Sequence, residues 1–95
     1  MAAYVIADIE VVDGAGYEEY RQKAPATIAA FGGRYLARGG ATEVLEGGWT
    51  PSRCVILEFP SMARFKEWWA SPAYQAIRPI RERTTKSKLI VTEGL

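Results

Sequence analysis

Histidine and asparagine are absent from this 95-residue chain, and Cys54 is its only thiol. A zinc centre, a histidine-based catalytic triad and a histidine-ligated haem all need side chains that the sequence lacks. A single cysteine also excludes an intramolecular disulfide framework. We therefore predict no metal and no cofactor. We interpret Cys54 as a small buried residue, because no histidine base is present to activate it as a nucleophile.

An excess of charge and a long apolar run are also missing. Twelve Lys and Arg residues nearly balance eleven Asp and Glu residues, which leaves a net charge of +1. The basic side chains between Arg78 and Lys88 follow the end of a predicted helix, where the helix dipole favours them, so we predict no nucleic-acid partner. No apolar run approaches the ~20 residues of a membrane span, and the first residues carry no basic leader. We therefore predict no membrane partner and expect a cytoplasmic location.

Strand patterns recur along the chain, each bounded by turn-forming residues. Runs rich in β-branched and alternating apolar residues predict strands over residues 4–12, 33–38, 53–59 and 87–93. A glycine pair at 39–40 and the short run at 43–46 predict a turn followed by a brief return strand.

Two helical regions separate these strands. Apolar residues at spacings of three and four predict a helix from Tyr17 to Phe31, with a kink or a break at Pro25. A second region begins after Ser61 and pairs aromatic residues over 65–69. Ser71 and the proline after it then predict an N-cap and the first position of a further segment.

The resulting order, β-α-β-β-α-β, has two similar halves within one domain spanning residues 1–95. Right-handed crossovers in both halves predict an α+β fold of the ferredoxin-like type. Its four-stranded antiparallel sheet has both helices on one face and the strand order 4-1-3-2.

The predicted sheet leaves one face uncovered by helices. Alternation along the strands places one aliphatic side chain of each strand on that face, and these are Ile6, Leu36, Ile56 and Ile90. Monomers rarely expose a continuous apolar patch, so we predict a homodimer in which two open faces pack together. A wet sheet face with scattered apolar residues is the alternative.

Four motifs in order carry a resemblance to a known family: GGRYLARGG (32–40), LEGGWTPSR (45–53), EFPS (58–61) and WWASPAYQ (68–75). Together they make the sequence resemble the bacterial family named domain of unknown function 1330, in the dimeric α/β-barrel superfamily. The resemblance spans nearly the whole chain and implies a ferredoxin-like protomer in a dimer whose sheets pack together, but no established reaction. Haem-degrading members of the superfamily use a histidine and an asparagine, and this chain has neither.

A small set of residues carries the chemistry we expect beside the sheet. Arg38, placed on the open face, is a candidate clamp for an anionic ligand, and Trp49 and Tyr74 are candidate walls of an apolar pocket. Asp8 and Glu58, on neighbouring strands, are weak candidates for a general acid or base. Each has a structural alternative: ion pairing across the sheet for the charged residues, and packing for the aromatic ones.

We therefore predict binding of a small organic molecule, anionic or aromatic, in a cleft by the sheet. A cofactor-independent monooxygenase or isomerase is the first alternative, because the superfamily includes such enzymes. A structural or regulatory dimer without a ligand is the second alternative. It predicts that every charge on the open face is paired and that no cavity remains.

Overall fold

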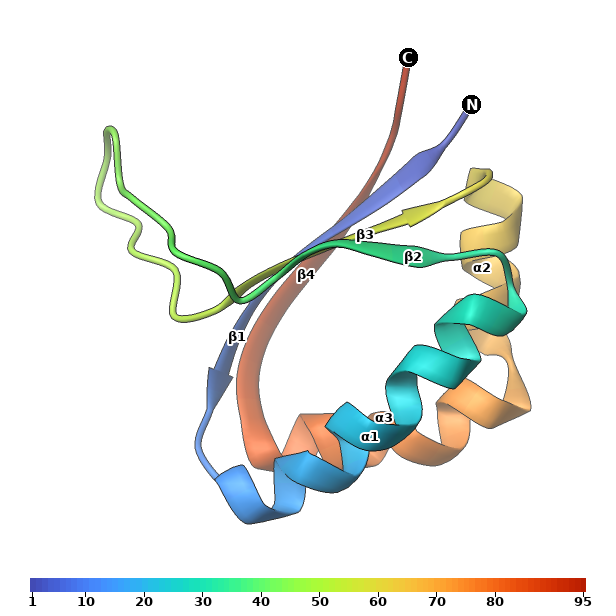
Figure 1. The fold of residues 1–95 in the computed structure, drawn as a ribbon, viewed down its shortest axis with the longest axis horizontal. Coiled ribbons are helices and arrows are strands. Elements are labelled where there is room, and N and C mark those ends of the chain that lie inside the picture. Colours follow the sequence, from blue (N-terminus) through green and yellow to red (C-terminus); the bar gives the residue numbers. More distant parts are fainter.

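The computed structural model describes residues 1–95 and contains four strands and three helices (Figure 1). The strands are β1 (Ala3–Val11), β2 (Arg34–Arg38), β3 (Cys54–Phe59) and β4 (Thr85–Glu93). The helices are α1 (Gly14–Ala30), α2 (Met62–Ala70) and α3 (Pro72–Thr84). None of the helices is long and apolar enough to cross a membrane.

The strands form one antiparallel sheet in the order β2-β3-β1-β4, which is the predicted order read from the other edge. All three helices lie on one side of this sheet, and its other side is open (Figure 1). The protein is accordingly flat, with extents of 36 × 33 × 16 Å. The predicted ferredoxin-like fold is confirmed.

Polar side chains begin each helix as the sequence indicates. Asp13 accepts a hydrogen bond from the backbone of Gly16 at 3.1 Å, and Ser61 and Ser71 each accept one from the residue three positions on, at 3.1 and 3.2 Å. These caps satisfy backbone donors that a helix start leaves free. Helix α1 runs through Pro25 without the predicted break.

The core lies between the helices and the inner face of the sheet. Alternation along the strands buries Val5, Ala7 and Ile9 of β1 and Val55, Leu57 and Phe59 of β3, as predicted. The same alternation predicts Val11 inside, but Val11 ends β1 and is 36% exposed, whereas Ala3, which precedes the predicted strand, is buried. Trp68 is fully buried among them, whereas its neighbour Trp69 is only half-buried. Consecutive helix positions point in different directions, which explains this difference.

The connection between β2 and β3 differs from the prediction. Residues 43–46 form no strand, and the whole stretch 39–53 is a long loop that projects from the open side of the sheet (Figure 1). Gly39 has a φ of +75°, a value that glycine adopts readily, and it turns the chain out of the sheet at the end of β2. The segment therefore has no neighbouring strand with which to pair.

Candidate functional site

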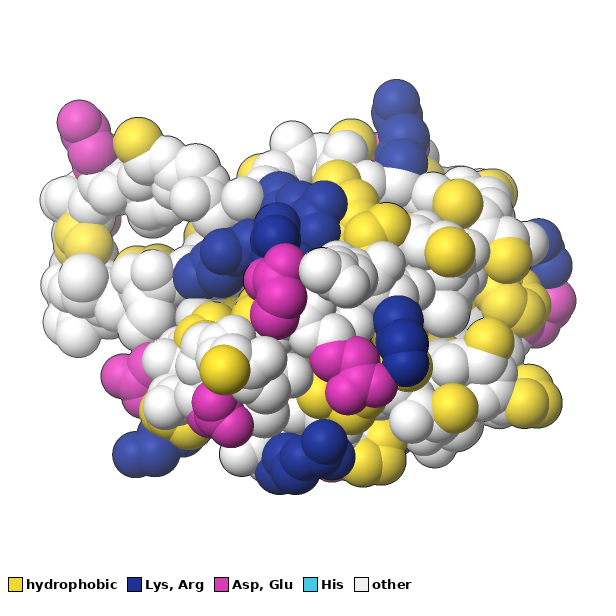
Figure 2. Space-filling model, turned by 60° about the horizontal axis from the view of Figure 1, so that its bottom comes forward, with side chains coloured by type: hydrophobic (Ala, Val, Ile, Leu, Met, Phe, Trp, Pro, Cys, Tyr) yellow, Lys and Arg dark blue, Asp and Glu magenta, His cyan; other side chains and the backbone are white.

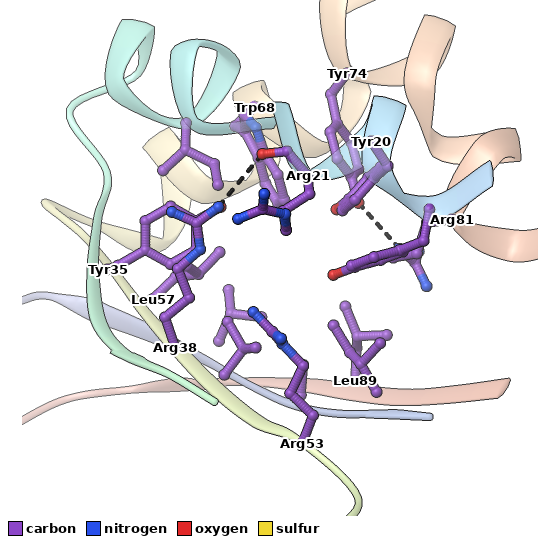
Figure 3. A pocket seen from close by; sticks show the side chains of 16 residues that line it. Tyr20, Arg21, Tyr35, Arg38, Arg53, Leu57, Trp68, Tyr74, Arg81 and Leu89 are labelled. Carbon is purple, nitrogen blue, oxygen red and sulfur yellow. Dashed lines mark hydrogen bonds between the residues drawn. The ribbon is translucent and has the colours of Figure 1, made fainter. Parts of the chain in front are cut away.

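A cavity between the helices and the inner face of the sheet is lined by four arginine side chains (Figure 3). It has about 500 Å³ of empty space, mouth included, of which about 40 Å³ can hold the centre of a water molecule. One water needs roughly 10–15 Å³ of such space, so the cavity admits a few water-sized groups. Besides apolar residues of the sheet, the wall has four arginines and four tyrosines: Arg21, Arg38, Arg53, Arg81, Tyr17, Tyr20, Tyr35 and Tyr74.

Arg38 reaches the cavity because β2 contains an irregularity of the β-bulge type. The pairing of β2 with β3 shifts between Tyr35 and Ala37, so that Arg38 lies opposite Val55, whose side chain faces the helices. Residues directly opposite one another on antiparallel strands share a face. The prediction that Arg38 lies on the open face is therefore wrong, because one extra residue in the strand reverses the alternation.

The guanidinium of Arg38 is held at the cavity by two contacts. It lies over the ring of Tyr35, 4.5 Å from the centroid, and its Nη2 donates to the backbone carbonyl oxygen of Arg21 at 3.3 Å (Figure 3). Four residues after Arg21 stands Pro25, which has no N–H to donate to that carbonyl. The proline in α1 thus leaves free the backbone acceptor that Arg38 uses.

Arg53 enters the cavity from the residue just before β3. Its side chain follows the inward parity of Val55 and Leu57 and packs over Gly39, where an added Cβ would lie 3.1 Å from the guanidinium. The Nε of Arg53 is buried and has no hydrogen-bond partner. A buried donor without a partner is uncommon in folded proteins, and here it lies beside an open cavity.

Arg81 approaches from α3 and is the most deeply buried of the four arginines, with 4% of its surface exposed. Its Nη1 donates to Ser87 Oγ at 2.7 Å, and its Nε donates to the hydroxyl of Tyr74 at 3.4 Å. Both acceptors are neutral. The charge of Arg81 therefore has no anionic partner, although burial of an unpaired ion is costly.

The cavity has a strong positive charge. Arg21 is neutralised by Glu18, 2.7 Å away, but none of the five ion pairs in the protein involves Arg38, Arg53 or Arg81. No carboxylate lines the cavity. In the space-filling view, Lys and Arg side chains gather near the centre, beside the projecting loop (Figure 2). Arg38, Arg53 and Arg81 thus line one cavity without an ion-pair partner.

Three of the four cavity tyrosines have raised pKa values. Burial raises the pKa of Tyr17 although all four cavity arginines act to lower it, and burial likewise raises the pKa of Tyr35. The pKa of Tyr20 is raised by burial and by Tyr74, whose hydroxyl oxygen lies 3.0 Å from its own. Because an ordinary tyrosine already titrates near 10, these three phenols keep their protons at neutral pH.

The structure separates the two candidate carboxylates. Asp8 lies opposite Cys54, whereas Glu58 lies opposite Tyr4, four residues further along β1. At ~3.4 Å per residue this places the two about 14 Å apart along the strand. Glu58 forms an ion pair with Arg34 at 2.8 Å. Asp8 and Glu58 share the open face, as predicted, but they do not form one site.

The other predicted residues also divide between the two faces. Tyr74 is fully buried and lines the cavity with Arg38, whereas Trp49 lies on the open side, where its indole Nε1 donates to Asp8 at 3.0 Å. Sequence reasoning assigned no cavity role to Arg81, which it placed among the basic side chains at a helix end. Alternation back from Val55 would have indicated the inward direction of Arg53.

An open four-stranded antiparallel sheet with helices on one face defines a protein with the ferredoxin-like fold. The family described as domain of unknown function (DUF1330) matches residues 2–95. The chain belongs to this family. A search of curated proteins found no match.

Solved structures share the fold at low sequence identity. A protein of unknown function from Rhodopseudomonas palustris, RPA0582, is 20% identical, with a TM-score of 0.82 over 99% of this chain and 82% of that one. SnoaB, a cofactor-independent oxygenase from Streptomyces nogalater, is 12% identical, with a TM-score of 0.61 over 99% and 92%. A putative antibiotic biosynthesis monooxygenase from Nitrosomonas europaea is 14% identical, with a TM-score of 0.57 over 99% and 90%.

Proposed function

We propose that the cavity between helices and sheet binds a small organic anion. The observation that carries this proposal is that Arg38, Arg53 and Arg81, none of them in an ion pair, line one cavity that no carboxylate lines. Guanidinium groups bind carboxylate and phosphate oxygens through paired, charge-assisted hydrogen bonds. A bound anion would supply the counter-charge that these arginines lack and an acceptor for the unpartnered Nε of Arg53.

The lining of the cavity favours a ligand that has an apolar part beside its anionic group. Apolar side chains of β1 and β3, including Val5, Ala7 and Leu57, form the wall opposite the helices. Apolar walls with a few convergent polar groups are typical of sites for small organic molecules.

Binding is better supported than a reaction that begins with removal of a proton from the substrate. A general base must lie within hydrogen-bond reach of that proton. The cavity is lined by no Asp, Glu, Lys, His or Cys, and three of its four tyrosines have raised pKa values. We therefore place anion binding ahead of a cofactor-independent monooxygenase or isomerase. A dimer without a ligand would leave Arg38, Arg53 and Arg81 without an ion-pair partner.

Arg38→Ala is expected to weaken anion binding by about 10- to 100-fold, the loss that one hydrogen bond to a charged group predicts. Benzoate and phenyl phosphate serve as probes, each titrated by calorimetry, with uncharged benzamide as the ligand control. Arg34→Ala is the matched protein control, because Arg34 lies on the same strand but pairs with Glu58 on the open face. The proposal fails if neither anion binds wild-type protein more tightly than it binds Arg38→Ala.

We also propose that the open face is covered by a second copy of the chain. Ile6 lies opposite Ile56 on one side and opposite Ile90 on the other, so the three isoleucines form a continuous row across β3, β1 and β4. Leu36 is exposed on the neighbouring strand, and 62% of Ile90 is exposed. A two-fold axis would bring two such rows together and remove them from water.

Ile90→Asp is expected to convert a wild-type dimer into a monomer, because it places a charge in the apolar row at its most exposed isoleucine. Sedimentation velocity at micromolar protein concentration measures the change. Val12→Asp is the control, since Val12 has similar exposure, 56%, but lies beyond the end of β1 and outside the row. A monomeric wild type, or an Ile90→Asp variant that stays dimeric, would disprove the proposed interface.

A further inference from the structure

Asp8 holds the end of the projecting loop from the open side of the sheet. One carboxylate oxygen accepts hydrogen bonds from the backbone N–H groups of Ser52 at 2.9 Å and Arg53 at 3.4 Å. The other oxygen accepts one from the indole Nε1 of Trp49 at 3.0 Å. A single side chain of β1 thus fixes three groups of the segment that leads into β3.

This segment decides where Arg53 stands. The backbone N–H of Arg53 donates to Asp8 on one side, and its carbonyl oxygen accepts from the N–H of Ile9 at 2.9 Å on the other. The side chain then passes to the opposite face of the sheet, over Gly39, which has no Cβ to obstruct it. The buried, unpartnered Nε of Arg53 therefore depends on a backbone position that Asp8 maintains from outside the cavity.

We propose that Asp8 is a positioning residue for the anion site, which holds the guanidinium of Arg53 in the cavity by binding its backbone across the sheet. This inference rests on the proposed anion binding. Asp8 itself does not line the cavity. Its role is to accept hydrogen bonds, and the indole of Trp49, more than any other contact, holds the pKa of Asp8 below its usual range.

Whether Asp8→Ala weakens or strengthens anion binding distinguishes a positioning role of Asp8 from a purely electrostatic one. A negative charge near the site repels an anion, so loss of the Asp8 charge alone would strengthen anion binding. Loss of the Asp8 carboxylate removes the acceptor for the backbone N–H groups of Ser52 and Arg53. The start of β3 then becomes mobile, the guanidinium of Arg53 no longer has one position in the cavity, and anion binding weakens. We expect the second effect to dominate in Asp8→Ala.

The test compares wild type, Asp8→Ala, Arg53→Ala and the double variant, with benzoate affinity measured by calorimetry. We expect each single variant to lose at least fivefold in affinity, and we expect Asp8→Ala to cause no further loss when Arg53 is already alanine. A purely structural role of Asp8 would lower the affinity equally in both backgrounds. That result, or unchanged or tighter binding by Asp8→Ala, would overturn the proposal.

Asp8→Asn is the conservative variant, in which benzoate affinity is expected to be restored. It also provides the test if Asp8→Ala does not fold. The amide oxygen of asparagine still accepts from Ser52 and Arg53, although its amide nitrogen cannot accept from Trp49. We expect Asp8→Asn to retain benzoate affinity within threefold of wild type, and a loss as large as that of Arg53→Ala would overturn the proposal. Absence of benzoate binding by wild type, or binding unaffected by Arg38→Ala, would instead count against the anion site itself.

Discussion

Replacement of Arg81 by methionine is expected to remove most of the anion affinity while leaving the protein at least as stable as wild type. Arg81 is buried without an anionic partner, and the penalty for a buried ion is on the order of several kcal/mol. Methionine has a similar length, no charge and a comparable preference for helices. The variant therefore trades a costly buried charge for apolar packing.

The hydrogen bonds around Arg81 show why this exchange leaves no polar group unpaired. Ser87 Oγ keeps Thr85 Oγ1 as a neighbour at 3.2 Å, and the hydroxyl of Tyr74 keeps that of Tyr20 at 3.0 Å. We expect the free energy of unfolding to stay equal or to rise by about 1–2 kcal/mol, as when buried ions are replaced by apolar residues. Benzoate affinity is expected to fall about 10- to 100-fold, as for loss of a charged hydrogen-bond donor.

Urea unfolding and benzoate calorimetry on the same samples measure both quantities. Arg83→Met is the matched control, because Arg83 lies two residues further along α3 and is exposed. That variant is expected to change neither quantity appreciably. An Arg81→Met protein that is less stable than wild type and still binds benzoate would show that Arg81 has a structural role and no role in binding.

Trp68→Ala is expected to cause the largest loss of stability of any single truncation proposed for this chain. Trp68 is 1% exposed, and its ring lies 4.0 Å from that of Tyr74 and 5.1 Å from that of Phe59, between centroids. Its indole Nε1 also donates to Thr27 Oγ1 on α1 at 3.1 Å. Truncation of a buried tryptophan costs about 3–5 kcal/mol, against the roughly 5–15 kcal/mol that separates native from unfolded states.

Trp69→Ala provides the matched comparison, because Trp69 is the next residue of the same helix but is only half-buried. Its ring carries the guanidinium of Arg78 at 4.2 Å, a contact worth about 0.5–2 kcal/mol. We expect it to lose less than half as much unfolding free energy as Trp68→Ala. Urea titrations at one protein concentration measure both, since dimerisation makes stability depend on concentration. An equal loss in the two variants would contradict the assignment of Trp68 to the core.

The fold could be predicted largely because its signals are local. Alternation along β1 and β3 depends only on neighbouring residues, and so do the caps at Ser61 and Ser71. The prediction of a return strand at 43–46 also used only local signals, and it is wrong. A short apolar run indicates a strand only if another strand lies alongside, and no local pattern reports that.

The candidate site was harder to predict because its residues come from separate parts of the chain. Arg38 and Tyr74 both line the cavity, but the alternation along the sequence places Arg38 on the wrong face. The bulge that reverses Arg38 exists only in the pairing of β2 with β3. Nothing in the sequence RYLAR distinguishes a regular strand from a bulged one.

The sequence by itself determined the order of the elements, the inner and outer rows of three strands, and the absence of histidine chemistry. The tertiary structure alone decided that Arg38, Arg53 and Arg81 line one cavity beneath the helices without a carboxylate. The physical reason is that alternation has a period of two, so a one-residue shift in strand pairing moves a side chain across the sheet. Alternation can be read along the chain, whereas the register of one strand against its neighbour is set only when the sheet forms.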